Sequence, residues 1–232
     1  MPALTLIGIS SMATRSLLAD LVAEYEARSG VRVAIESVGG VDAARRVMAG
    51  EAFDVVVLAA DALDKLGAAG RLLPGSRVDL VRSGVAVAVR AGAAKPDLST
   101  EDAVRQAVLA APTLGYSTGP SGVALAQLFE RWGIAEAIAP RIVTAPPGVP
   151  VGALVARGEV ALGFQQLSEL MHLDGISVVG TLPAAIQIVT TFSAAVCAAS
   201  TQADAARALL GFLASPQAAA TQLKHGMESA TS

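Results

Sequence analysis

Small polar residues follow two apolar segments near the start of the sequence, where they could bind an anion. Ser10 and Ser11 come directly after the apolar run of residues 4–9, and Ser37 and Gly39 follow a second apolar run. Helical periodicity begins after each polar pair, so these residues would stand where a strand gives way to a helix. Backbone N–H groups at a helix start carry partial positive charge, and neighbouring hydroxyls can donate further hydrogen bonds. This chemistry favours an oxyanion or a carboxylate as ligand, although serine in such positions also serves simply as a helix cap.

The same order of strand, polar turn and helix returns in the middle of the sequence. Ser117, Thr118, Ser121 and Gly122 follow the short apolar run of residues 114–116. The segment could be an ordinary turn rich in glycine and proline, but its hydroxyls also provide the donors that an anion needs. We therefore treat it as a second candidate binding segment.

Two glutamines, Gln165 and Gln166, come after a later apolar run. An amide both donates and accepts hydrogen bonds, which suits a carboxylate or a hydroxy acid. The candidate ligand-binding residues are therefore Ser10, Ser11, Ser37, Gly39, Ser117, Thr118, Ser121, Gly122, Gln165 and Gln166.

Catalytic residues stay unassigned at this stage. A proton-transfer reaction needs a base near the acidic carbon, and the sequence does not choose among His172, His225, Asp61, Tyr116 and the serine hydroxyls. The two histidines and the single cysteine, Cys197, form no cluster with zinc-ligand spacing, so no metal and no other cofactor is expected. Cys197 lies in an apolar run, which favours a small buried thiol over a nucleophile.

The composition indicates a globular protein that does not bind nucleic acid. Hydrophobic residues make up 53% of the 232 residues and charged residues 16%, enough for a core in one large domain or two small ones. A net charge of -3 and an aromatic content of 3% provide neither a basic surface nor a stacking platform. The apolar runs are shorter than the about 20 residues of a membrane-spanning helix, so the protein is not expected to be membrane-embedded.

The first residues lack the basic and apolar regions of a secretory signal. We therefore expect a cytoplasmic protein, or a periplasmic one whose leader was removed.

Short apolar runs alternate with segments of helical periodicity, which is typical of an α/β fold with crossover connections and parallel sheets. The expected strands are residues 4–9, 31–35, 55–58, 85–89, 114–116, 141–143, 161–164, 176–179 and 192–197. The expected helices are residues 13–29, 41–49, 62–69, 100–111, 121–133, 149–157, 166–170, 202–214 and 216–224.

Several segments, taken in order, resemble the two-lobed periplasmic solute-binding proteins, and most closely the molybdate-binding components of ABC transporters. They are the strand ending in Ser10 and Ser11, the strand ending in residues 37–40, and the segments of residues 49–61 and 158–164. The resemblance implies a type II periplasmic-binding-protein-like α/β fold, in which two lobes joined by two crossover hinges close on a small-molecule anion. For a transporter component, it also implies an ABC permease as partner.

The resemblance further implies where the lobes begin and end. One lobe would comprise residues 1–82 with residues 193–232, and the other would comprise residues 83–192.

The sequence departs from the molybdate-binding pattern after the late strand. Molybdate binders usually present a tyrosine there, whereas this sequence reads Phe164-Gln165-Gln166-Leu167. Loss of that hydroxyl favours an organic di- or tricarboxylate over a bare metal oxyanion. Residues 119–122 and 162–168 are also similar to those of aconitate isomerases, which shift a double bond by moving a proton. An isomerase on the same scaffold and an oxyanion-binding transporter component are therefore the alternatives to capture of an organic acid.

Overall fold

The computed structural model describes residues 4–146 and 148–230, and the chain divides into two compact units. Unit 1 comprises Met1–Arg82 and Thr191–Ser232, and unit 2 comprises Ser83–Thr190. Two strands, β4 (Val78–Arg90) and β9 (Val189–Val196), contribute residues to both units. Each unit has hydrophobic clusters of its own, so each is described separately.

Unit 1 begins with a strand, a helix and a second strand and then repeats this alternation. Besides its parts of β4 and β9, its elements are β1 (Thr5–Ser11), α1 (Arg15–Ser29), β2 (Arg32–Val38), α2 (Gly40–Met48), β3 (Val55–Ala59), α3 (Ala60–Ala68), α9 (Ala203–Leu213), α10 (Ala219–Lys224) and β10 (Glu228–Ser229). Short 3-10 turns precede α1 and α10 at Met12–Thr14 and Pro216–Ala218. Helix α1 ends at Ser29 and is followed by Gly30, whose φ of 71° lies in the left-handed region that glycine adopts without steric cost.

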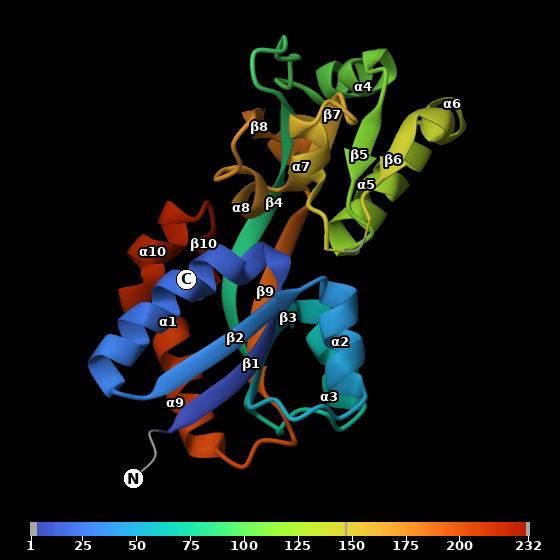
Figure 1. Cartoon of the computed structure of the whole chain (residues 1–232). Helices are drawn as coiled ribbons and strands as arrows, with labels where there is room; N and C mark the ends of the chain where they lie inside the picture. The colour runs from blue at the N-terminus through green and yellow to red at the C-terminus, as the bar shows by residue number, and fades with distance from the viewer. Residues whose placement is uncertain (1–3, 147, 231–232) are drawn as a thin grey trace. The chain divides into compact units, whose positions relative to one another are not determined.

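The sheet of unit 1 is covered by helices on both faces. Strand β1 pairs in parallel with β2 and β3, and β9 pairs with β3 in the antiparallel direction. Val55 and Val57 of β3 pack in the cluster that includes α1 and α9, whereas Val56 and Leu58 pack with α2 and α3 on the other face (Figure 1). Burial of both faces explains why this strand is a continuous apolar run without polar alternation.

Unit 2 has the same alternation of strands and helices around a smaller sheet. Besides its parts of β4 and β9, its elements are α4 (Glu101–Ala110), β5 (Leu114–Tyr116), α5 (Pro120–Arg131), α6 (Ala135–Ile138), β6 (Ile142–Thr144), α7 (Val151–Ala156), β7 (Leu162–Gln166), α8 (Leu167–Leu170) and β8 (Ile176–Thr181). The remaining 3-10 turns are Ala139–Arg141 and Ala184–Ile186.

An aromatic cluster joins α5 to the sheet of unit 2. Strand β5 pairs in parallel with β6 and β7, while β4 pairs antiparallel with β7 and β8. The ring of Phe129 on α5 lies 5.9 Å from the ring of Tyr116 and 6.1 Å from that of Phe164. Because Tyr116 and Phe164 are paired residues near the ends of β5 and β7, this packing holds the carboxyl ends of both strands beside α5.

The expected α/β fold is confirmed, and parallel pairs form in both units, but the sheets also contain antiparallel pairs. Strands β4 and β9 run antiparallel to neighbours in the sheet. Neither strand is joined to those neighbours by a strand-helix-strand crossover, and only such a crossover makes parallel pairing necessary. Within residues 4–146 and 148–230, no helix has both the length and the apolar character needed to span a membrane.

Candidate functional site

In unit 1, three serines meet at the carboxyl ends of β1 and β2. The register pairs Ser10 with Ser37 and Ser11 with Val38. The hydroxyl oxygens of Ser10 and Ser37 are 2.8 Å apart and share a hydrogen bond, and the Ser10 hydroxyl also lies 3.3 Å from the carbonyl oxygen of Ser11. The parallel pairing of two strands therefore brings together residues that are 27 positions apart in the sequence.

Ser11 is the unsatisfied member of this group. Its side-chain oxygen is buried without a hydrogen-bond partner among the described residues, and the residue is only 6% exposed. A Cβ built on Gly40 would lie 3.6 Å from the Cβ of Ser11, so the first turn of α2 lies beside the Ser11 side chain. The amide N–H groups of that turn have no partner within the helix. Ser11 and the start of α2 thus form a cluster of donors suited to an anion.

The hypothesis that these serines only cap helices does not fit the hydrogen bonds. Ser11 precedes the 3-10 turn at Met12–Thr14 but makes no side-chain cap bond, and Gly39, the residue before α2, has no side chain with which to cap. The first residue of α3 is likewise preceded by Ala59, which has no hydroxyl. The backbone N–H groups at the helix starts along this edge of the unit 1 sheet therefore donate to no capping side chain.

In unit 2, a second group of hydroxyls lies where β5 passes into α5. Ser117 and Ser121 have their hydroxyl oxygens 3.4 Å apart, and Ser121, in the first turn of α5, is 9% exposed. A Cβ built on Gly122 would lie 1.6 Å from the carbonyl oxygen of Ser117, so only glycine permits this approach. Thr118 is exposed and makes no hydrogen bond within the described part of the chain. The turn therefore presents its hydroxyls from a backbone that closes tightly on the helix.

The two glutamines at the end of β7 point in different directions, because successive side chains of a strand alternate between its faces. Gln165 accepts a hydrogen bond from the backbone N–H of Gly152 at 3.2 Å and donates one to Glu169 Oε1 at 2.8 Å. Gln166 donates from Nε2 to the hydroxyl of Thr190 at 2.8 Å. Its Oε1 is buried without a partner in the described residues, and Gln166 is 3% exposed.

Glu169 is a residue that the sequence analysis did not single out. It lies on α8, immediately after β7, and is half-buried. Burial raises the pKa of its carboxyl group to about 7, even though the hydrogen bond from Gln165 acts in the opposite direction. A carboxyl group that titrates near neutral pH can both take up and release a proton under ordinary conditions. Local spacing gives no signal for this contact, because Gln165 lies in β7 and Glu169 in α8.

The other candidate bases are less suited to proton transfer. Asp61 is exposed in the first turn of α3. Burial raises the pKa of the Tyr116 hydroxyl above its ordinary value, which disfavours the ionised form. His225 lies 3.0 Å from Asp20 in unit 1, and His172 is exposed in the turn that follows α8. Burial raises the pKa of the Cys197 thiol to about 12, so this cysteine is not an activated nucleophile.

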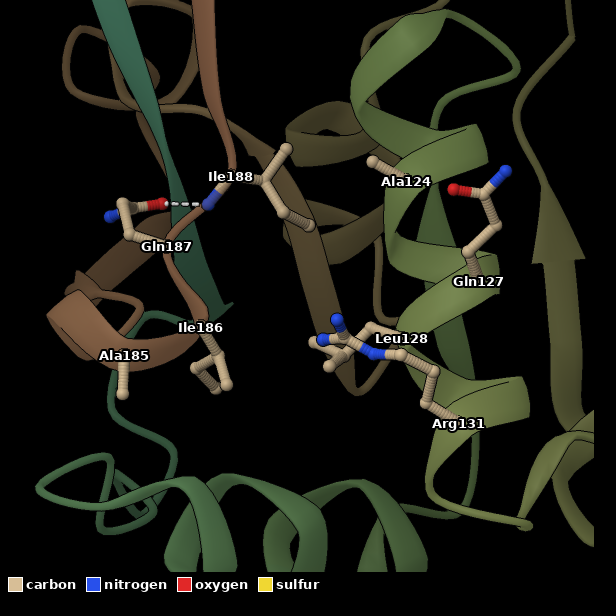
Figure 2. Close-up of a pocket in the computed structure, with 8 residues that line it drawn as sticks. All are labelled: Ala124, Gln127, Leu128, Arg131, Ala185, Ile186, Gln187 and Ile188. Carbon is tan, nitrogen blue, oxygen red and sulfur yellow. Dashed lines mark hydrogen bonds between the residues drawn. The ribbon is translucent and has the colours of Figure 1, made fainter.

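The lining of a pocket in unit 2 includes none of the predicted binding residues. It has a volume of about 290 Å³ and is lined by Ala124, Gln127, Leu128, Arg131, Ala185, Ile186, Gln187 and Ile188. Leu128 and Arg131 extend from α5 into the space beside Ile186, and the Gln187 side chain accepts a hydrogen bond from the backbone N–H of Ile188 (Figure 2).

The described residues contain no group of three or more potential metal ligands. The expectation that the protein holds no metal stays a prediction from the sequence.

Comparison with known proteins matches nearly the whole chain. The family described as bacterial extracellular solute-binding protein matches residues 6–228. Aconitate isomerase of Pseudomonas sp. is 42% identical over 224 residues, which cover 94% of this chain and 85% of that protein.

Solved structures share the fold at lower identity. The periplasmic molybdate-binding protein of Azotobacter vinelandii superimposes with a TM-score of 0.80 at 22% identity, over 96% of this chain and 98% of that one. The sulfate-binding protein SubI of Mycobacterium tuberculosis H37Rv also gives a TM-score of 0.80, at 17% identity, over 98% and 88%. The expected resemblance to molybdate-binding-like solute-binding proteins is thereby confirmed.

Proposed function

We propose that this protein, which belongs to the family of bacterial extracellular solute-binding proteins, is an isomerase that moves the double bond of a small unsaturated polycarboxylate such as aconitate. The observation that carries the proposal is the 42% identity to aconitate isomerase across 94% of the chain. The similarity leaves only 6% of this chain uncovered.

The chemistry of the two clusters supports a polycarboxylate as substrate. Unit 1 offers the buried Ser11 hydroxyl and the first turn of α2, and unit 2 offers the hydroxyls of Ser117 and Ser121. Hydroxyls and backbone N–H groups can bind several separated carboxylates without a metal. We include in the proposal the division into two lobes, residues 1–82 with 193–232 and residues 83–192.

The proposal is tested by proton NMR of trans-aconitate mixed with the protein. We expect the vinyl and methylene signals of cis-aconitate to grow over hours at a rate proportional to protein concentration. Chelator treatment should leave this rate unchanged, because the binding groups in the proposal are hydroxyls and amides. An unchanged spectrum would exclude isomerisation.

The second candidate function is capture of an anion for transport, in a periplasmic protein that delivers its ligand to an ABC permease. The fold likeness to the molybdate-binding and sulfate-binding proteins favours it. Calorimetry distinguishes the ligands: in the proposed function aconitate or citrate binds more tightly than molybdate or sulfate at fixed ionic strength. Micromolar binding of molybdate, with no heat from any organic acid, would favour the oxyanion-binding alternative.

Ser11→Ala and Ser121→Ala should each weaken binding of trans-aconitate by about 1–3 kcal/mol, because each removes a buried hydrogen bond to the ligand. The stability of the free protein should change little, since the Ser11 hydroxyl has no partner among the described residues and the contact between Ser117 and Ser121 is long at 3.4 Å. Isothermal calorimetry and thermal unfolding measure the two effects.

Ser99→Ala is the matched control in unit 2, because Ser99 is exposed and lies outside both clusters. Its affinity for trans-aconitate should equal that of the wild-type protein. Wild-type affinity in both Ser11→Ala and Ser121→Ala would place the ligand elsewhere.

A further inference from the structure

We propose that Glu169 is the base that carries the proton in this isomerisation. The assignment rests on the proposed function and adds the residue that performs its chemical step. Glu169 was not among the bases considered from the sequence, and it is selected by its place beside the end of β7 and by its contact with Gln165.

The backbone fixes where the carboxylate of Glu169 lies. Helix α8 begins at Leu167, the residue after β7 ends, so Glu169 stays within one helical turn of the carboxyl end of that strand. Strand β7 pairs in parallel with β5, and the register matches Phe164 with Tyr116. Gln165, near the end of β7, and Ser117, directly after β5, therefore lie at the same edge of the sheet. This edge is where ligands of α/β sheets bind.

Gln165 orients the carboxylate. Its Oε1 accepts from the backbone N–H of Gly152, so its Nε2 must face the other way, toward Glu169 Oε1. The second oxygen, Oε2, takes no hydrogen bond from any described residue, and in the proposal it is the oxygen that contacts the substrate. Gln165 thus acts as a positioning residue, because it holds one carboxylate oxygen and leaves the other free.

The surroundings of Glu169 contain few charges. Strands β7 and β8, which pack on α8, and helix α7, which packs on β7, contain no ionisable residue. Leu170 packs with Ala86 and Ala88 of β4, and the ionisable residue of β4 nearest to these positions is Arg90, at the paired end of β8. Beyond α8, His172 and Asp174 follow in the exposed turn. This apolar setting is the physical reason that the proton affinity of the carboxylate is high.

The isomerisation needs only one base, because the proton that Glu169 removes from one carbon is returned to another. Glu169 Oε2 removes a proton from the methylene carbon of trans-aconitate, and the electron pair of that C–H bond forms the new double bond to the central carbon. The electrons of the old double bond move to the former vinyl carbon, where the negative charge spreads into its carboxylate. The Glu169 carboxyl then returns the proton to that carbon, which becomes the new methylene. Hydroxyl and N–H donors that bind this carboxylate stabilise the charge.

The test compares E169Q, E169D and the control E159Q by NMR turnover and by calorimetry. Glu159 is exposed and paired with Arg157 in the same unit, so its replacement removes a carboxylate of unit 2 outside this cluster. We expect turnover of trans-aconitate to fall by about 10²–10⁴-fold in E169Q, less in E169D, and not in E159Q. The dissociation constant for trans-aconitate should stay within about threefold of wild type in E169Q, since an amide can keep the contact with Gln165.

The pH profile supplies an independent readout. In the wild-type protein, kcat/KM should rise with pH through about 7, because the ionised carboxylate is the base. The residual turnover of E169Q should not show this rise with pH. If E169Q folds, binds and turns over like the wild type, Glu169 is not the base and the proposed function stands. If the wild-type protein leaves aconitate unchanged, the proposed function fails and the assignment fails with it.

Discussion

Replacing Gly122 with alanine should lower the free energy of unfolding by about 3 kcal/mol. The new Cβ would stand 1.6 Å from the carbonyl oxygen of Ser117, a backbone atom that no side-chain rotation can move away. The turn must therefore shift, and Ser117 and Ser121 move with it. We expect binding of trans-aconitate to weaken by about 2 kcal/mol or more, because hydrogen bonds from both hydroxyls are affected.

Denaturant unfolding, followed by the fluorescence of Trp132, measures the loss of stability. Trp132 is the only tryptophan and lies in unit 2, directly after α5. Gly119→Ala is the matched control, because a Cβ there meets only the Ser117 hydroxyl at 3.7 Å and the φ of Gly119 is -77°. Equal stability of the two variants would contradict the close approach at Gly122.

Replacing Phe129 with alanine should cost about 3–5 kcal/mol of unfolding free energy. Phe129 is 1% exposed, and its ring contacts the rings of Tyr116, Trp132 and Phe164. The cavity would lie beneath the ends of β5 and β7, so unit 2 should lose stability and the polar residues after both strands should lose their fixed positions. Turnover of aconitate should fall together with the melting temperature.

Val123→Ala on the same helix is the control for Phe129→Ala. Val123 is 53% exposed, and its replacement should change stability by no more than about 0.5 kcal/mol. Fluorescence-detected unfolding and NMR turnover are measured on both variants. A stability loss below about 1 kcal/mol for Phe129→Ala would show that the aromatic cluster does not hold the sheet to α5.

Local patterns in the sequence predicted most of the secondary structure. The run of residues 55–58 predicts a buried strand because covering both faces of a sheet requires apolar residues without alternation. Short elements were missed: α6 has four residues and β10 has two, so each spans only about one period of its pattern and the pattern cannot repeat. Strand β4 begins at Val78, before the expected residue 85, because Asp79, Arg82 and Ser83 interrupt its apolar pattern.

Polar residues at strand ends could likewise be found from the sequence, because strand, turn and helix are contiguous there. Ser10, Ser11 and Ser37 were selected in this way, but the 2.8 Å contact between Ser10 and Ser37 depends on the register of β1 and β2, which no local pattern specifies. The unsatisfied oxygens of Ser11 and Gln166 also depend on packing, since a hydrogen bond is present or absent according to atoms brought in from distant segments.

Glu169 shows most clearly what only the tertiary structure decided. In the sequence it is one carboxylate in a short polar segment, and its ordinary pKa would make it an unremarkable ionised residue at neutral pH. The packing of α8 on β7 and β8 removes water from around it, and Gly152 turns the Gln165 amide toward it. The sequence thus determined the order of elements and the polar residues at their ends, because these depend on neighbouring residues. The proton affinity of a side chain depends on the solvent and charges that distant segments exclude or supply, and so it was decided by the fold.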